Sequence, residues 1–443
     1  MTGTATPPIY KRTEAETRDR SETVPLVSNL LFNRIEWSCH DSISPLETDW
    51  KELESRAKCS PFQRLSWVKP LYQNIHPEVS SGGLIKEEPF LITGHLNNQM
   101  VIVLPMVIEA SILGKCLKWI GSDISDYNGM IVDENIIAEI PRGFFDKLMA
   151  QVAEIVPDLD AIFLTRNPEI KNSLKSDIFP RGQSWDGEHS SHTLGLSHDW
   201  KSLYANIRSK KSRQRLRSKF RALQNKYEVT FRQVRNPEEK AEATNQILEW
   251  KSSQLKNRGS RNPFGSEVLP SRTRMTINAS VDDNCKKSVK VFGIYLDNQL
   301  VAGMLAFIAD GKFYYLVSAY APAFPSQYSV GTHLLVKTLE LASRAGLQEY
   351  DFLLGDEAYK FDWCDTHVPL KNYLIPLTVK GSIYGLGIKS ALTIKKQIMD
   401  SNFTNKVLRQ MIKATSINHH QLPVGRQAFS PPLSDRATSS QGA

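Results

Sequence analysis

A six-residue pattern, Leu-x-Asn-Gln-x-Val, occurs twice in the chain, at Leu96–Val101 and at Leu296–Val301. Apolar runs flank both copies, and an Asn-Asn or Asp-Asn pair tolerates positive φ, so each copy predicts a strand–turn–strand hairpin. In both halves a strand, a helix and a final strand are expected to follow. Their ranges are 116–120, 142–156 and 160–164, and then 312–320, 331–345 and 350–354. The repeated order predicts an internal duplication of one α/β unit.

The length of 443 residues agrees with a duplicated fold, because a single hydrophobic core stops growing well below that size. We expect a first domain over residues 31–195 and a second over 196–380. A C-terminal helix is expected over 381–415, between the second domain and a disordered tail of residues 416–443. A second disordered tail is expected over residues 1–30, where Thr, Pro, Arg and Glu predominate.

Cysteine usage and hydropathy favour a cytoplasmic protein. The five cysteines are odd in number and widely spaced, and no CxxC pair occurs, which argues against a disulfide framework and against a structural zinc site. The first 24 residues lack the apolar core of a signal peptide. The most apolar window, residues 100–113, is interrupted by Pro105 and Glu109, so it does not predict a membrane span. No metal is expected.

Positive charge is concentrated in one segment. Residues 208–226 contain nine basic residues and no acid, in a chain of net charge +8, which leaves −1 for the remainder. Leu216, Phe220 and Leu223 recur at helical spacing, so we expect an amphipathic helix that continues from Trp200. Three interpretations stay open: a solvated surface, a site for an anionic ligand such as a phosphate-bearing cofactor or acidic polymer, and nucleic-acid binding, which the sparse aromatic residues disfavour.

Ionisable side chains follow the last expected strand of the second half. Residues 350–354 read as a buried strand bounded by Gly346 and Gly355. The first copy has no equivalent acid and lysine after its final strand at Leu164, so the duplication predicts that the chemistry lies in the second half. The candidate residues are Asp356, Glu357, Tyr359 and Lys360.

The helix expected from Gly331 favours a phosphate site at its start. The first turn of a helix presents free backbone N–H groups and the positive end of the helix dipole. Gly331 allows close approach of a ligand, and Ser329 and Thr332 are suited either to cap the helix or to contact an anion. His333 is expected on the helix surface. The residues predicted to bind a phosphate-bearing cofactor are Gln327, Ser329, Val330, Gly331 and Thr332.

Eight segments carry a resemblance to a known family: residues 60–63 with Trp67, 125–127, 209–221, 301–303, 314–316, 318–320, 350–352 and 355–363. In these segments the chain resembles bacterial acetyltransferases of the GNAT superfamily associated with cellulose or exopolysaccharide biosynthesis, which are distant relatives of the FemABX peptidyltransferases. The resemblance covers residues 33–412. It implies an α/β fold of two tandem GNAT-like domains, each a mixed, mainly antiparallel sheet flanked by helices. It also implies that the second domain binds acyl-CoA, with Asp351 beside the cleft.

Acyl transfer from a thioester to an amine or hydroxyl needs a base for the acceptor proton and a proton source for the leaving thiolate. Glu357 is the first candidate base, and Asp356 is the second. Tyr359 is suited to donate a proton to the thiolate or a hydrogen bond to the acceptor. Lys360 is suited to stabilise negative charge. The alternative for Lys360 is a structural ion pair with Asp351 or Glu357.

Aromatic and acidic side chains of the first half favour an acceptor site. Trp67 and Tyr127, with Asp126, are suited to stack on a sugar ring and to bind its hydroxyls, although Trp67 equally fits a core position. We therefore expect an N- or O-acyltransferase that uses acetyl-CoA or another acyl-CoA. The expected acceptor is a sugar, a polysaccharide precursor or an amine, bound between the domains and next to Asp351.

Two alternatives to this function remain. One is a FemABX-like transferase that uses aminoacyl-tRNA, in which the 208–226 helix contacts nucleic acid. The other is a non-catalytic component of a polysaccharide-synthesis complex. Residues 386–412 combine apolar positions with lysines, so this helix is expected either to pack on the second domain, which is favoured, or to lie on the inner face of the membrane.

Overall fold

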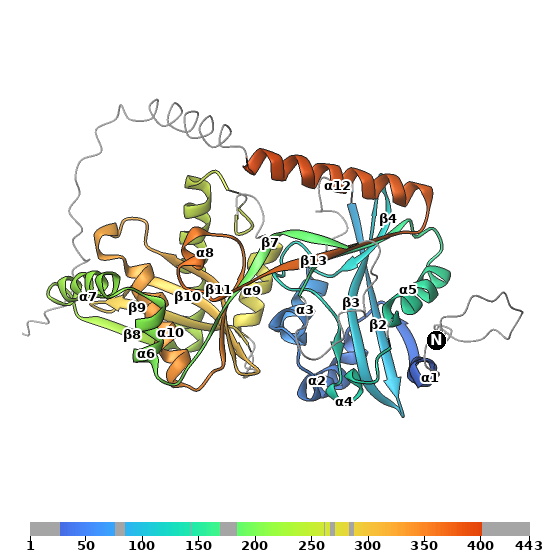
Figure 1. The fold of residues 1–443 in the computed structure, drawn as a ribbon, viewed down its shortest axis with the longest axis horizontal. Coiled ribbons are helices and arrows are strands. Elements are labelled where there is room, and N and C mark those ends of the chain that lie inside the picture. Colours follow the sequence, from blue (N-terminus) through green and yellow to red (C-terminus); the bar gives the residue numbers. More distant parts are fainter. Residues whose placement is uncertain are drawn as a thin grey trace, which may run out of the picture. The chain divides into compact units, whose positions relative to one another are not determined.

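Both predicted hairpins are present in the computed structural model of the protein (Figure 1). The turn residues Asn97 and Asn98 have φ of 53° and 62°, and Asp297 and Asn298 have φ of 47° and 64°. These are the left-handed conformations that a two-residue hairpin turn needs and that Asn and Asp tolerate. The hairpin strands are β2 (Ile85–Leu96) with β3 (Gln99–Ser111), and β9 (Lys290–Leu296) with β10 (Gln299–Ala309).

The structure describes residues 27–75, 85–141, 143–168, 184–260, 262–265, 271–282 and 288–400. The described residues up to Leu386 form one compact unit, and a second unit begins at Gly387. Most of the two predicted tails lies outside the described residues, as do residues 401–415 of the predicted C-terminal helix. Helix α1 (Val27–Arg34) begins within the predicted N-terminal tail.

Both halves contribute to one continuous sheet. Its other strands are β1 (Glu36–His40), β4 (Gly114–Trp119), β5 (Ile131–Val132), β6 (Ala161–Asn167), β7 (Ser184–Gly195), β8 (Val229–Val234), β11 (Lys312–Tyr320), β12 (Glu349–Leu354) and β13 (Thr366–Pro376). The order is β1-β2-β3-β4-β6-β13-β7-β12-β11-β10-β9-β8, and β5 pairs with β3. Neighbours are antiparallel except β4 with β6 and β11 with β12, which have equivalent places in the two halves. The predicted pair of mixed, mainly antiparallel α/β units is confirmed.

The halves exchange strands at the centre of the sheet. β13 follows the second half along the chain, yet it pairs with β6 of the first half, from Lys371 opposite Asn167 to Pro376 opposite Ala161. β7 lies between β13 and β12 and pairs with both. The predicted boundary between residues 195 and 196 stays a prediction, because no break in the sheet separates the two halves there.

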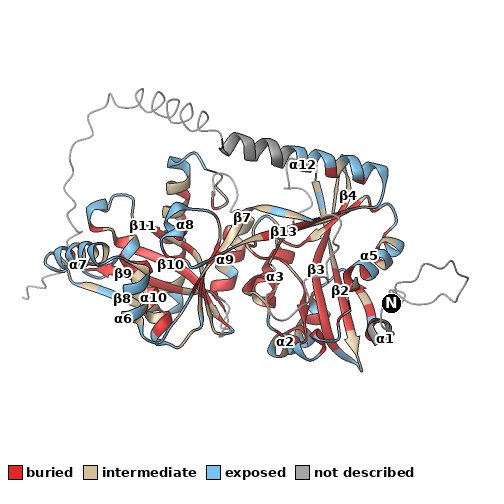
Figure 2. Ribbon diagram, in the orientation of Figure 1, coloured by how far each residue is buried: buried red, intermediate tan, exposed pale blue. Residues whose placement is uncertain are grey.

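Helices cover both faces of the sheet, as the burial pattern shows (Figure 2). One face has a core that both halves share, in which Trp67 of α3 (Leu65–Gln73) and Ile247 of α8 (Pro237–Asn257) take part, together with Phe307 of β10. The opposite face has separate cores, with α5 (Phe144–Ile155) over the first half and α10 (Val330–Arg344) over the second. Among the described residues, no helix is both long and apolar enough to cross a membrane. The helices are α2 (Glu47–Arg56), α3 (Leu65–Gln73), α4 (Glu134–Ile137), α5 (Phe144–Ile155), α6 (Trp200–Ile207), α7 (Lys210–Gln224), α8 (Pro237–Asn257), α9 (Arg272–Asp282), α10 (Val330–Arg344), α11 (Ala358–Phe361) and α12 (Val379–Asp400).

The helix of the basic segment, α7, does not continue from Trp200, so that part of the prediction was wrong. Arg208 has extended backbone angles, φ −131° and ψ 130°, and it separates α6 from α7. Ser209 then begins α7, because its hydroxyl accepts a hydrogen bond from the Ser212 N–H at 3.2 Å. A serine that caps a helix stops any preceding helix from running through it. Beyond the break, the Arg208 guanidinium lies over the ring of Trp363.

Candidate functional site

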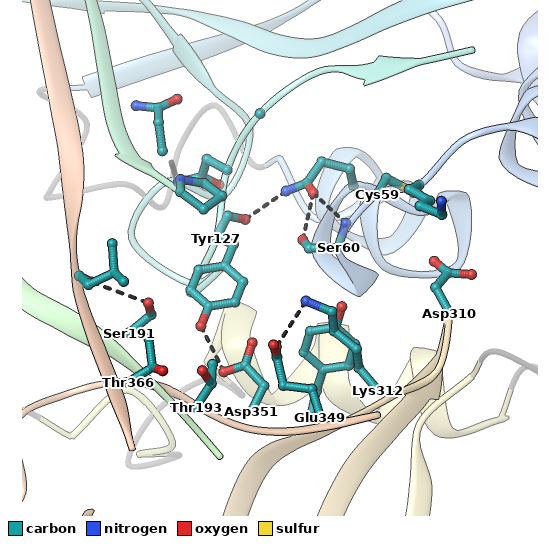
Figure 3. A pocket seen from close by; sticks show the side chains of 18 of the residues that line it. Cys59, Ser60, Tyr127, Ser191, Thr193, Asp310, Lys312, Glu349, Asp351 and Thr366 are labelled. Atoms are coloured by element: carbon teal, nitrogen blue, oxygen red, sulfur yellow. Dashed lines mark hydrogen bonds and ion pairs between the residues drawn. The ribbon is translucent and has the colours of Figure 1, made fainter. Parts of the chain in front are cut away.

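Tyr127 and Asp351 come from the two halves of the chain and meet between them (Figure 3). The Tyr127 hydroxyl donates a hydrogen bond to Asp351 Oδ1 at 2.8 Å, and the Leu353 backbone N–H donates to the same oxygen at 2.8 Å. Both side chains are buried. Two of the four residues predicted to bind the acceptor are therefore in direct contact, although 224 positions separate them in the sequence.

A cavity of about 550 Å³ lies beside this pair. Its walls come from both halves, and most of the side chains that line it carry a hydroxyl, an amide or a charge. Lys312 and Glu349, at the start of β11 and β12, form an ion pair of 2.9 Å there (Figure 3). The other polar lining residues include Ser60, Gln63, Asn128, Asn167, Ser191, Thr193, Asp310 and Thr366.

The carboxyl group of Asp351 titrates near neutrality. Burial raises the pKa of Asp351 to about 7, and the neighbouring charge of Glu349 acts in the same direction. The hydrogen bonds from Tyr127 and Leu353, and the positive charge of Lys312, oppose this rise in pKa. A carboxyl group with such a pKa is able to take up and release a proton at physiological pH, which is what general acid–base catalysis requires.

Asp351 stands where two parallel strands part. β11 and β12 pair only from Lys312 opposite Glu349 to Tyr314 opposite Asp351, although β11 continues to Tyr320. The register between β12 and β7 is also irregular just past Asp351. Successive side chains of a strand point to opposite faces. Asp351 and Tyr314 accordingly line the cavity, whereas the side chains on either side of Asp351 join the core beneath α10.

The predicted catalytic cluster follows β12, and its lysine is buried. Lys360 Nζ donates to the Leu354 carbonyl at 2.8 Å and forms an ion pair of 3.1 Å with Glu357. Gly355, at φ 120°, allows this arrangement, because a Cβ atom there would lie 2.7 Å from the Glu357 carboxylate. Burial acts to raise the pKa of Glu357, but the charge of Lys360, its hydrogen bond and the charge of Lys251 together lower that pKa below its usual value. The ion pair between Lys360 and Glu357, which the sequence left open, is present in the structure.

Asp356 contacts three groups that were not predicted from the sequence. It accepts a hydrogen bond from His192 Nε2 at 2.9 Å, lies 3.3 Å from His189 Nδ1 and accepts from the Ser190 N–H. His192 is fully buried, and its Nδ1 lies 2.7 Å from Nδ1 of the exposed His367. The histidines lower the pKa of Asp356 against the effect of burial. The only sequence signal for this cluster was the spacing His-Ser-Ser-His at 189–192.

The remaining predicted residues lie in different surroundings. Tyr359 is partly exposed and shares a hydrogen bond with Tyr315 of β11. Asp126 faces the end of β12: burial raises its pKa, whereas the charges of Arg166 and Lys360 lower it. Trp67 is only 1% exposed, donates to Ser125 Oγ at 3.0 Å and does not line the cavity, which agrees with the core position left open for it.

A second cavity, of about 260 Å³, lies at the start of α10. Basic side chains of α6–α7 form one wall, Ser329 and Thr332 of the predicted phosphate turn form another, and Tyr204 and Trp363 complete it. Three of the lining residues, Arg208, Arg215 and Lys219, are basic, and none is acidic. The structure thus brings together two features that the sequence predicted separately.

The positive side chains of this cavity are held in place. Lys219 Nζ donates to Ser329 Oγ at 2.7 Å. The Arg208 guanidinium donates to Ser212 Oγ at 3.0 Å, pairs with Asp362 at 3.3 Å and lies over the Trp363 ring, 4.8 Å from its centroid. No acidic side chain in the part of the chain that the structure describes pairs with Lys219. The cavity therefore keeps uncompensated positive charge.

The first turn of α10 has no side-chain cap. Ser329, at φ 53°, precedes the helix, but no capping hydrogen bond runs from its side chain, which instead accepts the bond from Lys219. The N–H groups of Thr332 and His333 bond to the Ser329 carbonyl, so helix geometry leaves those of Val330 and Gly331 without an intrahelical acceptor.

The side chains of three residues near this turn lie outside the cavity. Gln327 lies in the short helix before α10 and hydrogen-bonds Tyr328 rather than lining the cavity. The Val330 side chain is buried in the core. His333 is buried against Phe220 and not on the helix surface, which corrects that prediction; the apolar contact of α7 with α10 covers it. Burial, with the charges of Lys219 and Lys337, lowers the pKa of His333 to about 4.

Residues 210–361, from α7 to α11, match the family model described as an acetyltransferase (GNAT) domain. A crystal structure of FemX is similar over 79% of this chain and 99% of its own, with 12% identity and a TM-score of 0.50. A tandem GNAT protein from the clavulanic acid biosynthesis pathway has 11% identity and a TM-score of 0.38, over 77% of this chain and 97% of its own.

A conserved protein of unknown function from Bacteroides thetaiotaomicron has 11% identity and a TM-score of 0.43, over 77% of this chain and 99% of its own. No curated protein matches the sequence. The likeness to FemX is one of fold. Among the described residues, no group of three or more His, Cys, Asp or Glu side chains is arranged to hold a metal ion.

Proposed function

We propose that the protein is an acyltransferase that moves an acetyl or other acyl group from acyl-CoA to a hydroxyl or amine acceptor. The observation that carries this proposal is the cationic cavity at the uncapped start of α10, within the segment that matches an acetyltransferase domain. Backbone N–H groups at a helix start, together with Arg and Lys side chains, are the groups that bind phosphates in proteins.

We place the diphosphate of the donor in this cavity. Its oxygens would accept hydrogen bonds from the Val330 and Gly331 N–H groups and from Thr332, while Lys219 and Arg215 neutralise its charge. The absence of an acidic lining residue among those described around the cavity supports an anionic ligand. From there the pantetheine arm would run toward the point where β11 and β12 part, next to Asp351.

The cavity beside Asp351 is the proposed acceptor site. Its hydroxyl, amide and charged side chains suit a ligand rich in hydrogen-bonding groups, such as a sugar or a polysaccharide precursor of the cellulose or exopolysaccharide type. Tyr127, buried beside Asp351, would position that ligand from the first half, and Asp126 would hold the end of β12 through the hydrogen bond to Leu354.

Asp351 suits the role of general base better than Glu357, the first candidate from the sequence. The pKa of Asp351 lies near neutrality, whereas the ion pair with Lys360 lowers the pKa of Glu357 and makes it a weaker base. The Asp351 carboxylate would take the proton of the acceptor as its oxygen or nitrogen attacks the thioester carbon. The C–S bond then breaks, and the leaving CoA thiolate takes up a proton, for which Tyr359 is the candidate donor.

Calorimetric titration with acetyl-CoA and with longer acyl-CoAs tests the donor assignment. Lys219→Glu is expected to weaken binding strongly, because it places a negative charge in the cavity. Arg221→Glu on the same helix does not alter a lining residue and serves as the matched control. Gly331→Asp should weaken binding as Lys219→Glu does. Absence of heat with every acyl-CoA would overturn the assignment, and equal losses in both helix variants would overturn the location of the site.

A second candidate is transfer from aminoacyl-tRNA, which the basic residues of α7 outside the cavity favour. Lys210, Lys211, Arg217 and Arg221 are exposed and do not line the cavity. Such binding would fall steeply with salt and would require tRNA. Turnover with acetyl-CoA in the absence of RNA separates the two candidates.

A further inference from the structure

At the start of helix α12, aliphatic side chains face solvent and glycines face the sheet. A helix that packs only on its own protein turns its apolar side chains inward. In α12, Gly381 and Gly385 face the sheet and Tyr384 packs beside them against Leu374, whereas Val379, Ile383 and Leu386 are 79%, 65% and 67% exposed. The three aliphatic residues are spaced by four and three positions, so they form one stripe along the outer side of the helix.

The two glycines fix this orientation. A Cβ atom at Gly381 would lie 1.8 Å from the Asp160 carbonyl oxygen, and one at Gly385 would lie 2.1 Å from Leu374 Cδ2. The helix backbone therefore rests directly on the end of β13 and on the residue before β6. If the helix rotated about its axis to turn the aliphatic stripe inward, those side chains would not fit between the helix and the sheet. The close packing of the helix therefore holds the stripe outward.

A second exposed apolar segment lies at the same end of the sheet. Ile112 and Leu113, in the turn between β3 and β4, are 84% and 61% exposed. Asp160 links the two segments: its carboxylate accepts the Lys115 N–H at 2.9 Å and the Thr378 hydroxyl at 2.7 Å. Among the large apolar side chains of the described residues, the five most exposed are those of this turn and of α12.

The charge around these residues indicates what covers them. Lys380 flanks the stripe: its side chain is 57% exposed, and its ammonium group lies 3.8 Å from the Asp160 carboxylate. Helix α12 (Val379–Asp400) contains four lysines and one acid, Asp400. Exposed aliphatic residues combined with an excess of lysine are typical of helices that lie in the interface of an anionic membrane, where the apolar side enters the acyl boundary and the lysines meet lipid phosphates.

We propose that Ile112, Leu113, Val379, Ile383 and Leu386 form a docking surface for an anionic phospholipid bilayer. The surface holds the acyltransferase at the membrane without spanning it. This inference does not depend on the proposed reaction, because lipid binding is measured without substrate.

Flotation of the full chain with vesicles tests the proposal. We expect binding to vesicles of phosphatidylcholine with about 30% phosphatidylglycerol, and weak binding to phosphatidylcholine alone. The variant Val379→Ser/Ile383→Ser/Leu386→Ser should lower the partition coefficient about tenfold or more, since three side chains leave the apolar phase. Its unfolding temperature should stay that of the wild type because the replaced side chains are exposed. Ile155→Ser, at an exposed position of helix α5, is the matched control and should bind as the wild type does.

Three outcomes would overturn the proposal. Absence of binding to anionic vesicles would mean that another part of the chain covers the stripe. A concentration-dependent dimer in light scattering that the triple variant abolishes would assign the surface to a second copy. Equal vesicle binding by wild type and triple variant, with Ile112→Ser/Leu113→Ser also unchanged, would place any membrane contact elsewhere.

Discussion

The hydroxyl of Tyr127 donates to the carboxylate of Asp351 at 2.8 Å, and this bond joins the two halves of the chain at the point where β11 and β12 part. Each of the two groups shifts the pKa of the other. The hydrogen bond from Tyr127 keeps the pKa of Asp351 from rising further in its buried place, and the pKa of Tyr127 is raised well above its usual value by burial and by the Asp351 charge. The first half thereby adjusts a carboxyl group that the second half carries.

Removing the Tyr127 hydroxyl should shift the pH dependence of acyl transfer. In Tyr127→Phe, Asp351 loses a hydrogen bond that lowers its pKa, so the rising limb of the pH–rate profile should move from about pH 7 to higher pH. We expect a loss of about 1 kcal/mol in stability as well. The matched control is Tyr72→Phe, which removes a buried hydrogen bond to the Met106 carbonyl and should change stability but not the profile. An unshifted profile in Tyr127→Phe would separate Asp351 from the proton transfer.

Replacement of single carboxylates distinguishes the two candidate bases. Asp351→Asn keeps the shape of the side chain and the acceptor for Tyr127 but removes the base, so acceptor-dependent release of CoA thiol should fall about 100-fold or more. Glu357→Gln should leave most of that rate, because the Glu357 carboxylate is already engaged in an ion pair with Lys360. The reverse order of effects, measured by thiol release at pH 7.5, would restore Glu357 as the base.

Acidification should destabilise the contact between α7 and α10 through His333. The pKa of His333 is lowered from 6.5 to about 4 in the folded protein, so between these values the unfolded chain binds more protons and the free energy of unfolding rises with pH. The contribution reaches up to about 3 kcal/mol above pH 6.5 and is lost as the pH falls toward 4. Urea unfolding from pH 4.5 to 7.5 should show a shallower pH dependence in His333→Leu than in the wild type. Parallel curves for the two proteins would contradict this assignment.

The sequence was sufficient for features that short stretches determine. The Asn-Asn and Asp-Asn turns, the strand at 350–354 and the helix expected from Gly331 follow from local preferences, and the structure contains all of them, with the helix beginning at Val330. The repeated order of elements also predicted a duplicated fold correctly. Local patterns carry this information because hydrogen bonds within a hairpin or helix join residues that are close in sequence.

Contacts between distant segments were beyond the sequence. Nothing local to Asp351 indicates that Tyr127 approaches it, and Glu357 and Asp351 are equally acidic in sequence, so only burial and ion pairing separate their pKa values. The break at Ser209 was predictable, since serine favours the start of a helix. The burial of His333 was not, because it depends on where α7 packs.

The glycines of α12 provide a test of the packing that turns its aliphatic residues outward. Gly381→Ala places a methyl group against the Asp160 carbonyl, where backbone leaves no room, so the helix start must move. We expect a loss of about 2 kcal/mol, the range for overpacked sites, measured by urea unfolding. Gly387→Ala in the same helix meets no atom within 4 Å and should stabilise the protein by up to about 1 kcal/mol, because alanine favours helix more than glycine does. If both variants gained stability alike, α12 would not rest on Asp160, and the outward direction of its apolar stripe would lose its physical cause.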